Sequence, residues 1–316
     1  MTMATNALAT YQAIGNREDL SDMIWRIDPT DTPFMTGVDK TKATAVNHEW
    51  QTQALAGASG SNAQLEGDDI SADAATPTVR LGNIAQISRK TAAVTGTQQA
   101  VDHAGRDDEM AYQEMLKGLE LKRDMETILL QNQAKVTGDT TTARKLSSVL
   151  SWIKTSTSVG ATGSDPGTSG TNSRTDGTQR VFTEAQLKTV LSSIWTNGGK
   201  PDTVMVGAFN KQQFSTFTGR ASPIEETKSK KITASVDAYE SDFGTIKVVA
   251  NRFMRTRDCL VLEMDKWGVA FLNGRKMVSI PLAIVGDARR KSVLSEYTLE
   301  ARNEKASGGV FDLTAS

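Results

Sequence analysis

Hydrophobic residues in the first forty positions are regularly spaced but sparse. Behind a capping Asn16, the apolar residues of 17–27 recur at helical spacing and form one stripe. They are Leu20, Met23, Ile24 and Ile27. Pro29 ends this predicted helix, because the residue before a proline avoids the helical region. The next segment is predicted to be extended, and Phe34 and Met35 are its apolar anchors.

Apolar and polar residues alternate along the next two segments. The alternation covers residues 43–55 and returns over 77–95, which predicts two antiparallel strands joined by a long polar loop. The phase slips near Asn83, which indicates a β-bulge beside Gly82. A lone two-stranded ribbon is marginal in water. We therefore expect the partners of this hairpin to be other copies of the same chain, which favours an assembly subunit.

The strongest helical pattern spans residues 106–133. Its apolar residues fall on two roughly opposite faces. One face holds Tyr112, Met115, Leu116 and Leu119, and the other holds Leu121, Met125, Ile128 and Leu129. This arrangement predicts a long helix whose two halves are covered from opposite sides, by a sheet and by an overlying arm.

The remaining sequence predicts a second compact region. Residues 155–180 are low in complexity and lack an apolar run, so we interpret them as a flexible surface loop. A helix starts at Thr183, and its inward residues are Leu187, Val190, Leu191 and Ile194. A short strand at 203–206 and a helix at 210–218 follow. Further strands are predicted at 232–239, 245–250, 259–264, 269–272, 277–280 and 293–302. Helices and strands mix without regular alternation, which predicts the α+β class.

Charge and composition narrow the function. The 316 residues include 36 Lys and Arg against 37 Asp and Glu, a net charge of −1, which argues against a dedicated nucleic-acid binder. Cys259 is the only cysteine, so neither an internal disulfide nor a thiolate metal cluster can form, and a reducing cytoplasm suits the chain. No stretch approaches the ~18 apolar residues of a membrane span.

The sequence lacks recognisable catalytic chemistry. His48 and His103 are the only histidines, they lie far apart, and we interpret both as structural. Neither phosphate-binding glycine loops nor hydrolase or metalloprotease motifs occur. We therefore predict no catalytic, cofactor-binding or metal-binding residues.

An acidic cluster lies at the predicted hairpin tip. Glu66, Asp68 and Asp69 form either a solvated turn or a charge-paired contact with a neighbouring subunit. Candidate basic partners lie at 89–90, 228–231 and 289–291. The predicted assembly contacts are Leu20, Ile24, Ile27, Phe34, Trp50, Glu66, Asp68, Asp69, Arg89, Lys90, Lys228, Lys230 and Lys231.

Four segments, in order, resemble the major capsid proteins of tailed bacteriophages with the Hong Kong 97-like fold. Residues 24–38 (IWRIDPTDTPFMTGV) resemble their N-terminal arm, and residues 47–55 (NHEWQTQAL) look like the start of their extended loop. The helix at 106–133 is similar in place and length to their spine helix. Residues 297–314 (YTLEARNEKASGGVFDLT) look like their last peripheral-domain strand and tail.

The resemblance implies a domain organisation. It assigns an N-terminal arm to 1–42, an extended-loop hairpin to 43–98, and a peripheral domain with the spine helix to 99–149. An axial domain would span 150–287, and the last peripheral strand and tail 288–316.

It also implies a non-enzymatic shell subunit. Such proteins form hexamers and pentamers that close into an icosahedral head around double-stranded DNA, which the near-neutral charge suggests is confined rather than tightly bound. The expected location is the virion, with assembly in the cytoplasm of the host bacterium and no membrane partner. Scaffolding, portal and decoration proteins are candidate partners, and about fifteen residues before the arm suggest that any scaffold is a separate protein or was removed earlier.

Two other functions stay open at this point. The first is an encapsulin-like cellular compartment with the same fold, which would enclose an enzyme rather than DNA. The second is a hydrolase or transferase whose site is not recognisable from sequence. Particle mass would separate this last class from the shells.

Overall fold

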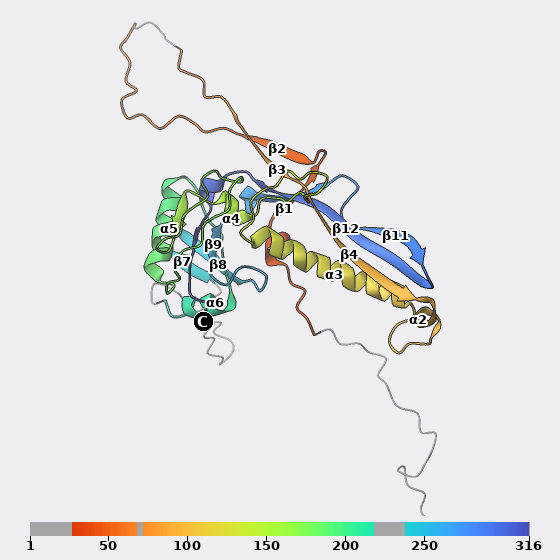
Figure 1. The fold of residues 1–316 in the computed structure, drawn as a ribbon. Helices are drawn as coiled ribbons and strands as arrows, with labels where there is room; N and C mark the ends of the chain where they lie inside the picture. The colour runs from red at the N-terminus through yellow and green to blue at the C-terminus, as the bar shows by residue number, and fades with distance from the viewer. Residues whose placement is uncertain (1–26, 68–71, 218–237, 316) are drawn as a thin grey trace, which may run out of the picture.

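The computed structural model describes residues 27–67, 72–217 and 238–315 (Figure 1). Its longer helices are α3 (Glu109–Leu130), α5 (Glu184–Thr196) and α6 (Ala208–Phe214), and its short ones are α1 (Pro33–Gly37), α2 (Gly96–Ala100), α4 (Val149–Trp152), η1 (Met264–Lys266) and η2 (Glu304–Ala306). Its strands are β1 (Asp39–Ala43), β2 (Asn47–Thr52), β3 (Val79–Ile84), β4 (Gln86–Thr95), β5 (Ser156–Ser158), β6 (Thr203–Val206), β7 (Ala238–Ser241), β8 (Gly244–Ala250), β9 (Cys259–Leu262), β10 (Trp267–Leu272), β11 (Val278–Val285), β12 (Ala288–Ala301) and β13 (Gly308–Val310). This mixture confirms the predicted α+β class.

The first sheet is built around the long strand β12. On one side β12 pairs antiparallel with β4, and on the other side with β11 and then with β10. Strand β1 extends the sheet by pairing parallel with β10. β12 alternates little in burial over its second half, because it is covered on both faces.

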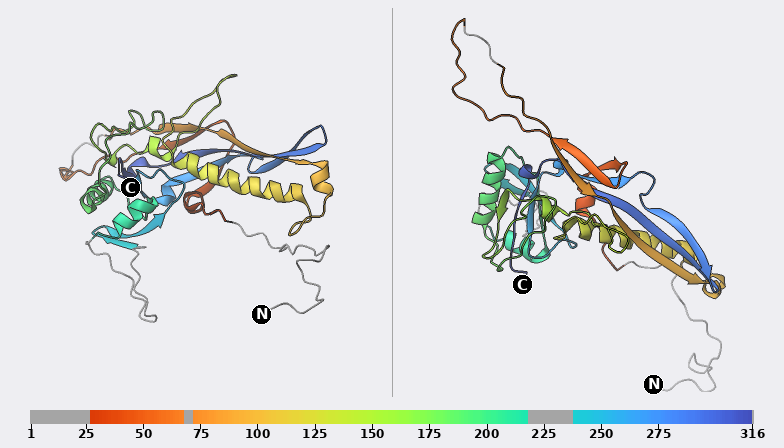
Figure 2. Two further views of the ribbon diagram at one scale, coloured as in Figure 1. Left: turned by 60° about the horizontal axis from the view of Figure 1, so that its bottom comes forward. Right: turned by 45° about the horizontal axis from the view of Figure 1, so that its top comes forward.

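The long helix α3 packs along β4 and β12 of this sheet (Figure 2). Asp108 caps its first turn by accepting a 3.1 Å hydrogen bond from the N–H of Ala111. Leu121, Met125 and Leu129 of the predicted second face are buried, whereas Met115 of the first face is 46% exposed. The long helix is confirmed, but within one chain only one of its two apolar faces is well covered.

The second sheet is six-stranded, in the order β5–β13–β9–β6–β8–β7. Helix α5 packs on β5 and β13, and its four predicted inward residues, Leu187, Val190, Leu191 and Ile194, are all buried. A capping box between Thr183 and Gln186 fixes its start. The predicted strands at 203–206, 245–250 and 259–264 form the centre of this sheet, while residues 232–237 lie outside the described residues.

The segment 155–180 lies at the surface, as predicted, but it is packed against the body and contains strand β5, which the prediction of a flexible loop did not include. Strand β5 joins the second sheet. The guanidinium carbon of Arg174 lies 3.4 Å from the ring centre of Phe311, and a guanidinium nitrogen of Arg174 lies 2.7 Å from a carboxylate oxygen of Asp165. Gly170 has a φ of +71° and lies directly against Trp152. Small and polar residues are suited to such backbone contacts, which a search for apolar runs cannot detect.

Strand pairing also differs from the predicted hairpin. Only Val79–Ile84 pairs with β2, and beyond Ala85 the chain pairs with β12 along the whole of β4. The sequence predicted a single return strand, because β3 and β4 show the same alternation of apolar and polar residues.

The predicted boundary between the axial domain and the last peripheral strand, at residue 287, cuts across the first sheet, since β10 and β11 pair with β12. The domain boundaries themselves stay a prediction.

Candidate assembly surfaces

The arm is fixed to the long helix by one buried carboxylate. The N–H groups of Phe34 and Met35 donate to the two oxygens of Glu126 at 2.8 and 2.9 Å. Asn251 Nδ2 donates to the same carboxylate at 2.7 Å. Burial raises the pKa of Glu126, and the hydrogen bonds from Met35, Phe34 and Asn251 oppose that rise. The carboxylate therefore ties three separate segments together.

The predicted arm anchors take different places. Phe34 is fully buried in the core of its own chain, together with Met35 and Val38. Ile27 is 95% exposed, so its side chain is available to another subunit. Leu20 and Ile24 lie outside the described residues.

Trp50 anchors the base of the β2–β3 hairpin within its own chain. Its Nε1 donates to the carbonyl oxygen of Ala301 at 2.9 Å, and its ring centre lies 5.4 Å from that of Trp152. On the same strand, His48 Nε2 lies 3.7 Å from a carboxylate oxygen of Glu300, and this neighbouring ring lowers the pKa of Glu300. The predicted structural role of His48 agrees with this packing against β12.

Asn83 fixes the point where the chain leaves the hairpin and enters the first sheet. Its Nδ2 donates to the carbonyl oxygens of Ser147 and Leu299 at 3.0 and 2.8 Å. Its Oδ1 accepts from the N–H groups of Ser147 and Ile84 at 2.8 and 2.9 Å. The side chain is buried and fully bonded, which explains the phase slip seen in the sequence.

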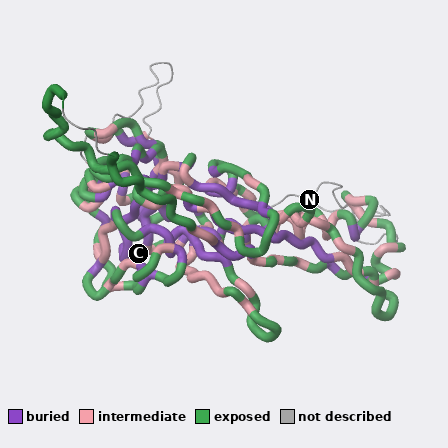
Figure 3. Tube along the Cα trace, turned by 90° about the horizontal axis from the view of Figure 1, so that it is seen from above, coloured by how far each residue is buried: buried purple, intermediate pink, exposed green. Residues whose placement is uncertain are grey.

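Beyond this base the loop projects from the body and is uncovered (Figure 1). Every described residue of 53–67 and 72–78 is exposed, as Figure 3 shows along the tube. Leu55 and Leu65 are 95% and 80% exposed. Glu66 is also exposed, while Asp68 and Asp69 lie outside the described residues. This uncovered segment, with its two exposed leucines, is a candidate surface for contact with another subunit.

The candidate basic partners of the loop tip are not equivalent. Arg89 is exposed on β4. Lys90 Nζ lies 2.8 Å from Asp124 of α3, and this hydrogen bond raises the pKa of Lys90. Lys90 therefore already has an acidic partner in its own chain. Lys228, Lys230 and Lys231 lie outside the described residues. These assembly contacts stay predictions.

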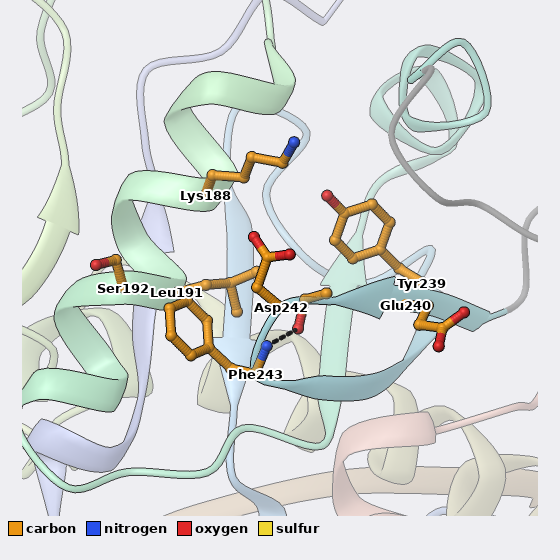
Figure 4. A pocket seen from close by; sticks show the side chains of 8 residues that line it. Lys188, Leu191, Ser192, Tyr239, Glu240, Asp242 and Phe243 are labelled. Atoms are coloured by element: carbon orange, nitrogen blue, oxygen red, sulfur yellow. Dashed lines mark hydrogen bonds between the residues drawn. The ribbon is translucent and has the colours of Figure 1, made fainter.

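A second exposed apolar feature lies where α5 meets the edge strand β7. A cavity of 380 Å³ opens there, and Figure 4 shows Leu191, Tyr239 and Phe243 around it. The ring of Phe243 stacks on Trp195 at 5.5 Å, and Trp195 is 61% exposed. The lining combines apolar surface with carboxylates, serine hydroxyls and a lysine.

In the part of the chain that the structure describes, no group of three or more His, Cys, Asp and Glu side chains is placed to hold a metal ion. Cys259 is buried, and burial raises the pKa of its thiol, which disfavours the reactive thiolate. Among the same residues, none of the helices combines the length and apolar character needed to span a membrane.

Sequence reasoning missed Glu126 and Asn83, the two polar residues that hold the arm and the hairpin. Glu126 follows Met125 and belongs to the side of α3 that buries Leu121, Leu129 and Leu130. The available signal was a carboxylate on the apolar face of the predicted helix. A carboxylate is rarely buried unless it is hydrogen-bonded, so this position indicated a bonded partner. Asn83 carried a signal in the slipped phase, which was interpreted as a bulge.

Comparison with known proteins agrees with this architecture. The model of the family "SU10 major capsid protein" matches residues 3–314. The major capsid protein of Escherichia phage Phieco32 is 28% identical, over 96% of this chain and 96% of that protein. Solved structures of Gordonia phage Cozz (TM-score 0.63, 8% identity, 99% and 98% of the two chains) and of the capsid of a native GTA particle (TM-score 0.64, 9% identity, 98% and 100%) share the fold.

These matches bear on the functions left open by the sequence. The structural neighbours have the Hong Kong 97-like capsid fold, which confirms the predicted fold. They are phage and phage-like capsids rather than encapsulins, so the protein is a shell-forming capsid subunit of a tailed phage. With its family model covering almost the whole length, the chain belongs to the SU10 major capsid protein family.

Proposed function

We propose that this chain forms hexamers and pentamers that close into an icosahedral head around double-stranded DNA. In this proposal the subunits assemble in the host cytoplasm and carry out no catalytic step. Scaffolding, portal and decoration proteins are the expected partners. A solved structure of phage G contains a major capsid protein together with decoration proteins, and this chain covers 100% of the matched chain at a TM-score of 0.54.

The exposed loop is the observation that carries this proposal. Residues 53–67 and 72–78 lie free of the body, although their base is firmly bonded through Trp50 and Asn83. A loop that is rigidly held at its base and uncovered at its tip is suited to reach a neighbouring subunit. Ile27 is exposed and precedes the buried Phe34, which supports a similar contact between the arm and a neighbouring subunit.

Shortening the loop tests the proposal. Gln53 Nε2 donates a 2.9 Å hydrogen bond to the carbonyl oxygen of Thr76, so the two sides of the loop are still close there. A short Gly-Ser turn can therefore join residues 53 and 77. We expect a folded subunit with unchanged circular dichroism that no longer forms particles by electron microscopy or light scattering. Regular particles from this variant would contradict the proposal.

Point variants separate the apolar and charged parts of the loop. Leu55→Ser with Leu65→Ser should weaken assembly through lost apolar contact. Reversing Glu66, Asp68 and Asp69 to lysine should lower the melting temperature of particles more than that of subunits, if the tip forms ion pairs. Unchanged particle melting after charge reversal would indicate a solvated tip.

A test of the N-terminal arm by truncation must leave the arm residues that belong to the buried core in place. Removing residues 1–38 would delete the buried Phe34, Met35 and Val38, so loss of shells could result from misfolding. Removing residues 1–30 keeps α1 and the bonds to Glu126. We expect this shorter truncation to leave a folded subunit with impaired assembly.

A further inference from the structure

A small cavity lies where the arm crosses the long helix. It has a volume of 220 Å³ and is formed by α1, the start of β1, α3 and the turn between β10 and β11. Three of its lining residues are lysines from three different elements: Lys40 of β1, Lys122 of α3, and Lys276 of the turn. The fold therefore gathers three positive charges that are far apart in the sequence.

These lysines have no acidic partner among the described residues. Acids that neighbour the lining residues in sequence have other partners: Asp39 pairs with Arg302, and the carboxylate of Glu126 accepts hydrogen bonds from the N–H groups of Phe34 and Met35 and from Asn251. The Lys276 ammonium lies 4.8 Å from the ring centre of Phe271, a contact that leaves its charge uncompensated. Three like charges around one cavity repel each other unless an anion lies between them.

The cavity is suited to a small anion. Its volume is below the ~300 Å³ at which pockets begin to hold drug-sized ligands, so it fits one anionic group rather than a whole nucleotide. Thr32 and Thr36 add hydroxyl groups to the lining, and Met35, Met125 and Phe271 add apolar surface. The three lysines are exposed, so an anion can reach them from solvent.

The type of cation favours phosphate over carboxylate. A planar carboxylate is best matched by the forked guanidinium of arginine, and no arginine lines this cavity. Lysine ammonium groups act as point charges, which suit the oxygens of a tetrahedral phosphate. Duplex DNA presents phosphates every ~1.7 Å along its axis, so several subunits of one shell could each take one.

We propose that this cavity, lined by Lys40, Lys122 and Lys276, binds phosphate groups of double-stranded DNA. The proposal deepens the proposed function, on which it rests, by assigning the arm-covered side of α3 to the DNA. Each contact is weak, but many copies in one shell add up. This agrees with a near-neutral subunit that holds DNA mainly by confinement.

Duplex DNA binding by the purified full-length subunit tests the proposal. The site variant is Lys40→Gln, Lys122→Gln and Lys276→Gln. The matched control is Lys200→Gln, Lys247→Gln and Lys305→Gln, which removes the same charge from exposed lysines elsewhere. A short fluorescent duplex is titrated at several salt concentrations, after melting curves show that both variants fold.

The expected result is specific to the site variant. Each phosphate contact contributes ~0.9 to the slope of log affinity against log salt, so losing the one phosphate that the cavity holds should lower that slope by about 1. The control should keep the slope of the unchanged protein, and inorganic phosphate should compete with the duplex. Equal slopes in both variants, or no duplex binding at all, would overturn the proposal.

Two further outcomes separate related ideas. If a polyglutamate peptide displaces the duplex at lower concentration than inorganic phosphate, the cavity prefers carboxylates and its partner is an acidic protein segment, which also overturns the proposal. Because binding is measured on subunits, it does not depend on particle formation. Failure to form shells would therefore count against the proposed function and leave the result on DNA binding intact.

Discussion

Replacing Glu126 with alanine should detach the arm from the long helix. The carboxylate is fully buried and accepts hydrogen bonds from the N–H groups of Phe34 and Met35 and from Asn251 Nδ2. Alanine offers none of these acceptors. Both backbone donors would then be buried without a partner, unless the arm moves out to meet water.

The magnitude follows from the number of orphaned donors. A buried donor left unsatisfied costs about 1–3 kcal/mol, so three donors set an upper range of about 3–9 kcal/mol. Removing the carboxylate also removes its own burial penalty, which is the cause of its raised pKa. The net loss should be about 3–5 kcal/mol, in the lower part of that range, because the lost burial penalty offsets part of the cost of the orphaned donors. Glu120→Ala, which breaks only a surface pair with Lys117, should cost about 0.5 kcal/mol or less.

Hydrogen exchange of the arm amides measures this effect directly. A loss of ~3 kcal/mol corresponds to roughly 100-fold faster exchange, because each 1.4 kcal/mol is a factor of ten. The Phe34 and Met35 amides should show this change in the unassembled Glu126→Ala subunit and keep their protection in Glu120→Ala. Unchanged protection in Glu126→Ala would refute the role assigned to the carboxylate.

Three further changes test other parts of the structure. Trp50→Phe removes the donor to Ala301 and should cost about 1–2 kcal/mol in urea unfolding, whereas Trp195→Phe at an exposed position should cost less than about 0.5 kcal/mol. Gly170→Ala should destabilise the subunit by about 2 kcal/mol or more, because φ is +71° and the new Cβ would lie 2.4 Å from Trp152, while Gly57→Ala in open loop should be nearly neutral in the same melting assay. Burial raises the pKa of Asp258 to about 7, so the folded state binds the proton more tightly than the unfolded state, and stability should fall, by up to about 4 kcal/mol, as the pH rises from about 4 to 8. Asp258→Asn should flatten this pH profile, and an unchanged profile would place the titrating group elsewhere.

Periodic burial made much of this fold predictable from sequence. Helix α5 and its four inward residues could be predicted because every turn of that helix contacts the same core. The long helix could be predicted from the length of its helical pattern and from the acidic residues at its start. Its predicted first apolar face is less well covered, since Met115 is exposed in the single subunit. Trp50 was predicted to be an assembly contact, and this stays a prediction. Its contacts within its own chain, with α4 and β12, were not predicted, because those partners are distant in sequence.

Failures arose where backbone and polar contacts decide the structure. Gly170 and Arg174 pack residues 155–180 against Trp152 and Phe311, and neither contact leaves a hydrophobic period in the sequence. The change of partner strand at Asn83 was also hidden, because β3 and β4 alternate alike whether they pair with β2 or with β12. Register and partner choice depend on tertiary contacts that alternation alone does not encode.

The bonds at Asn83 and Trp50 have a consequence for the loop that they support. Trp50 lies two residues from the loop end of β2 and Asn83 four residues from the loop end of β3, so at ~3.3 Å per residue the loop begins ~7 to 13 Å from this base. A rotation of the base by ~10° would move the start of the loop by up to ~2 Å, more than side-chain packing between subunits tolerates. The buried polar bonds at the base therefore matter more for aiming the loop than for the stability of one subunit. The described loop, residues 53–67 and 72–78, can stay largely polar and without strand pairing in the single subunit, because its conformation need only be fixed when a neighbouring surface meets it.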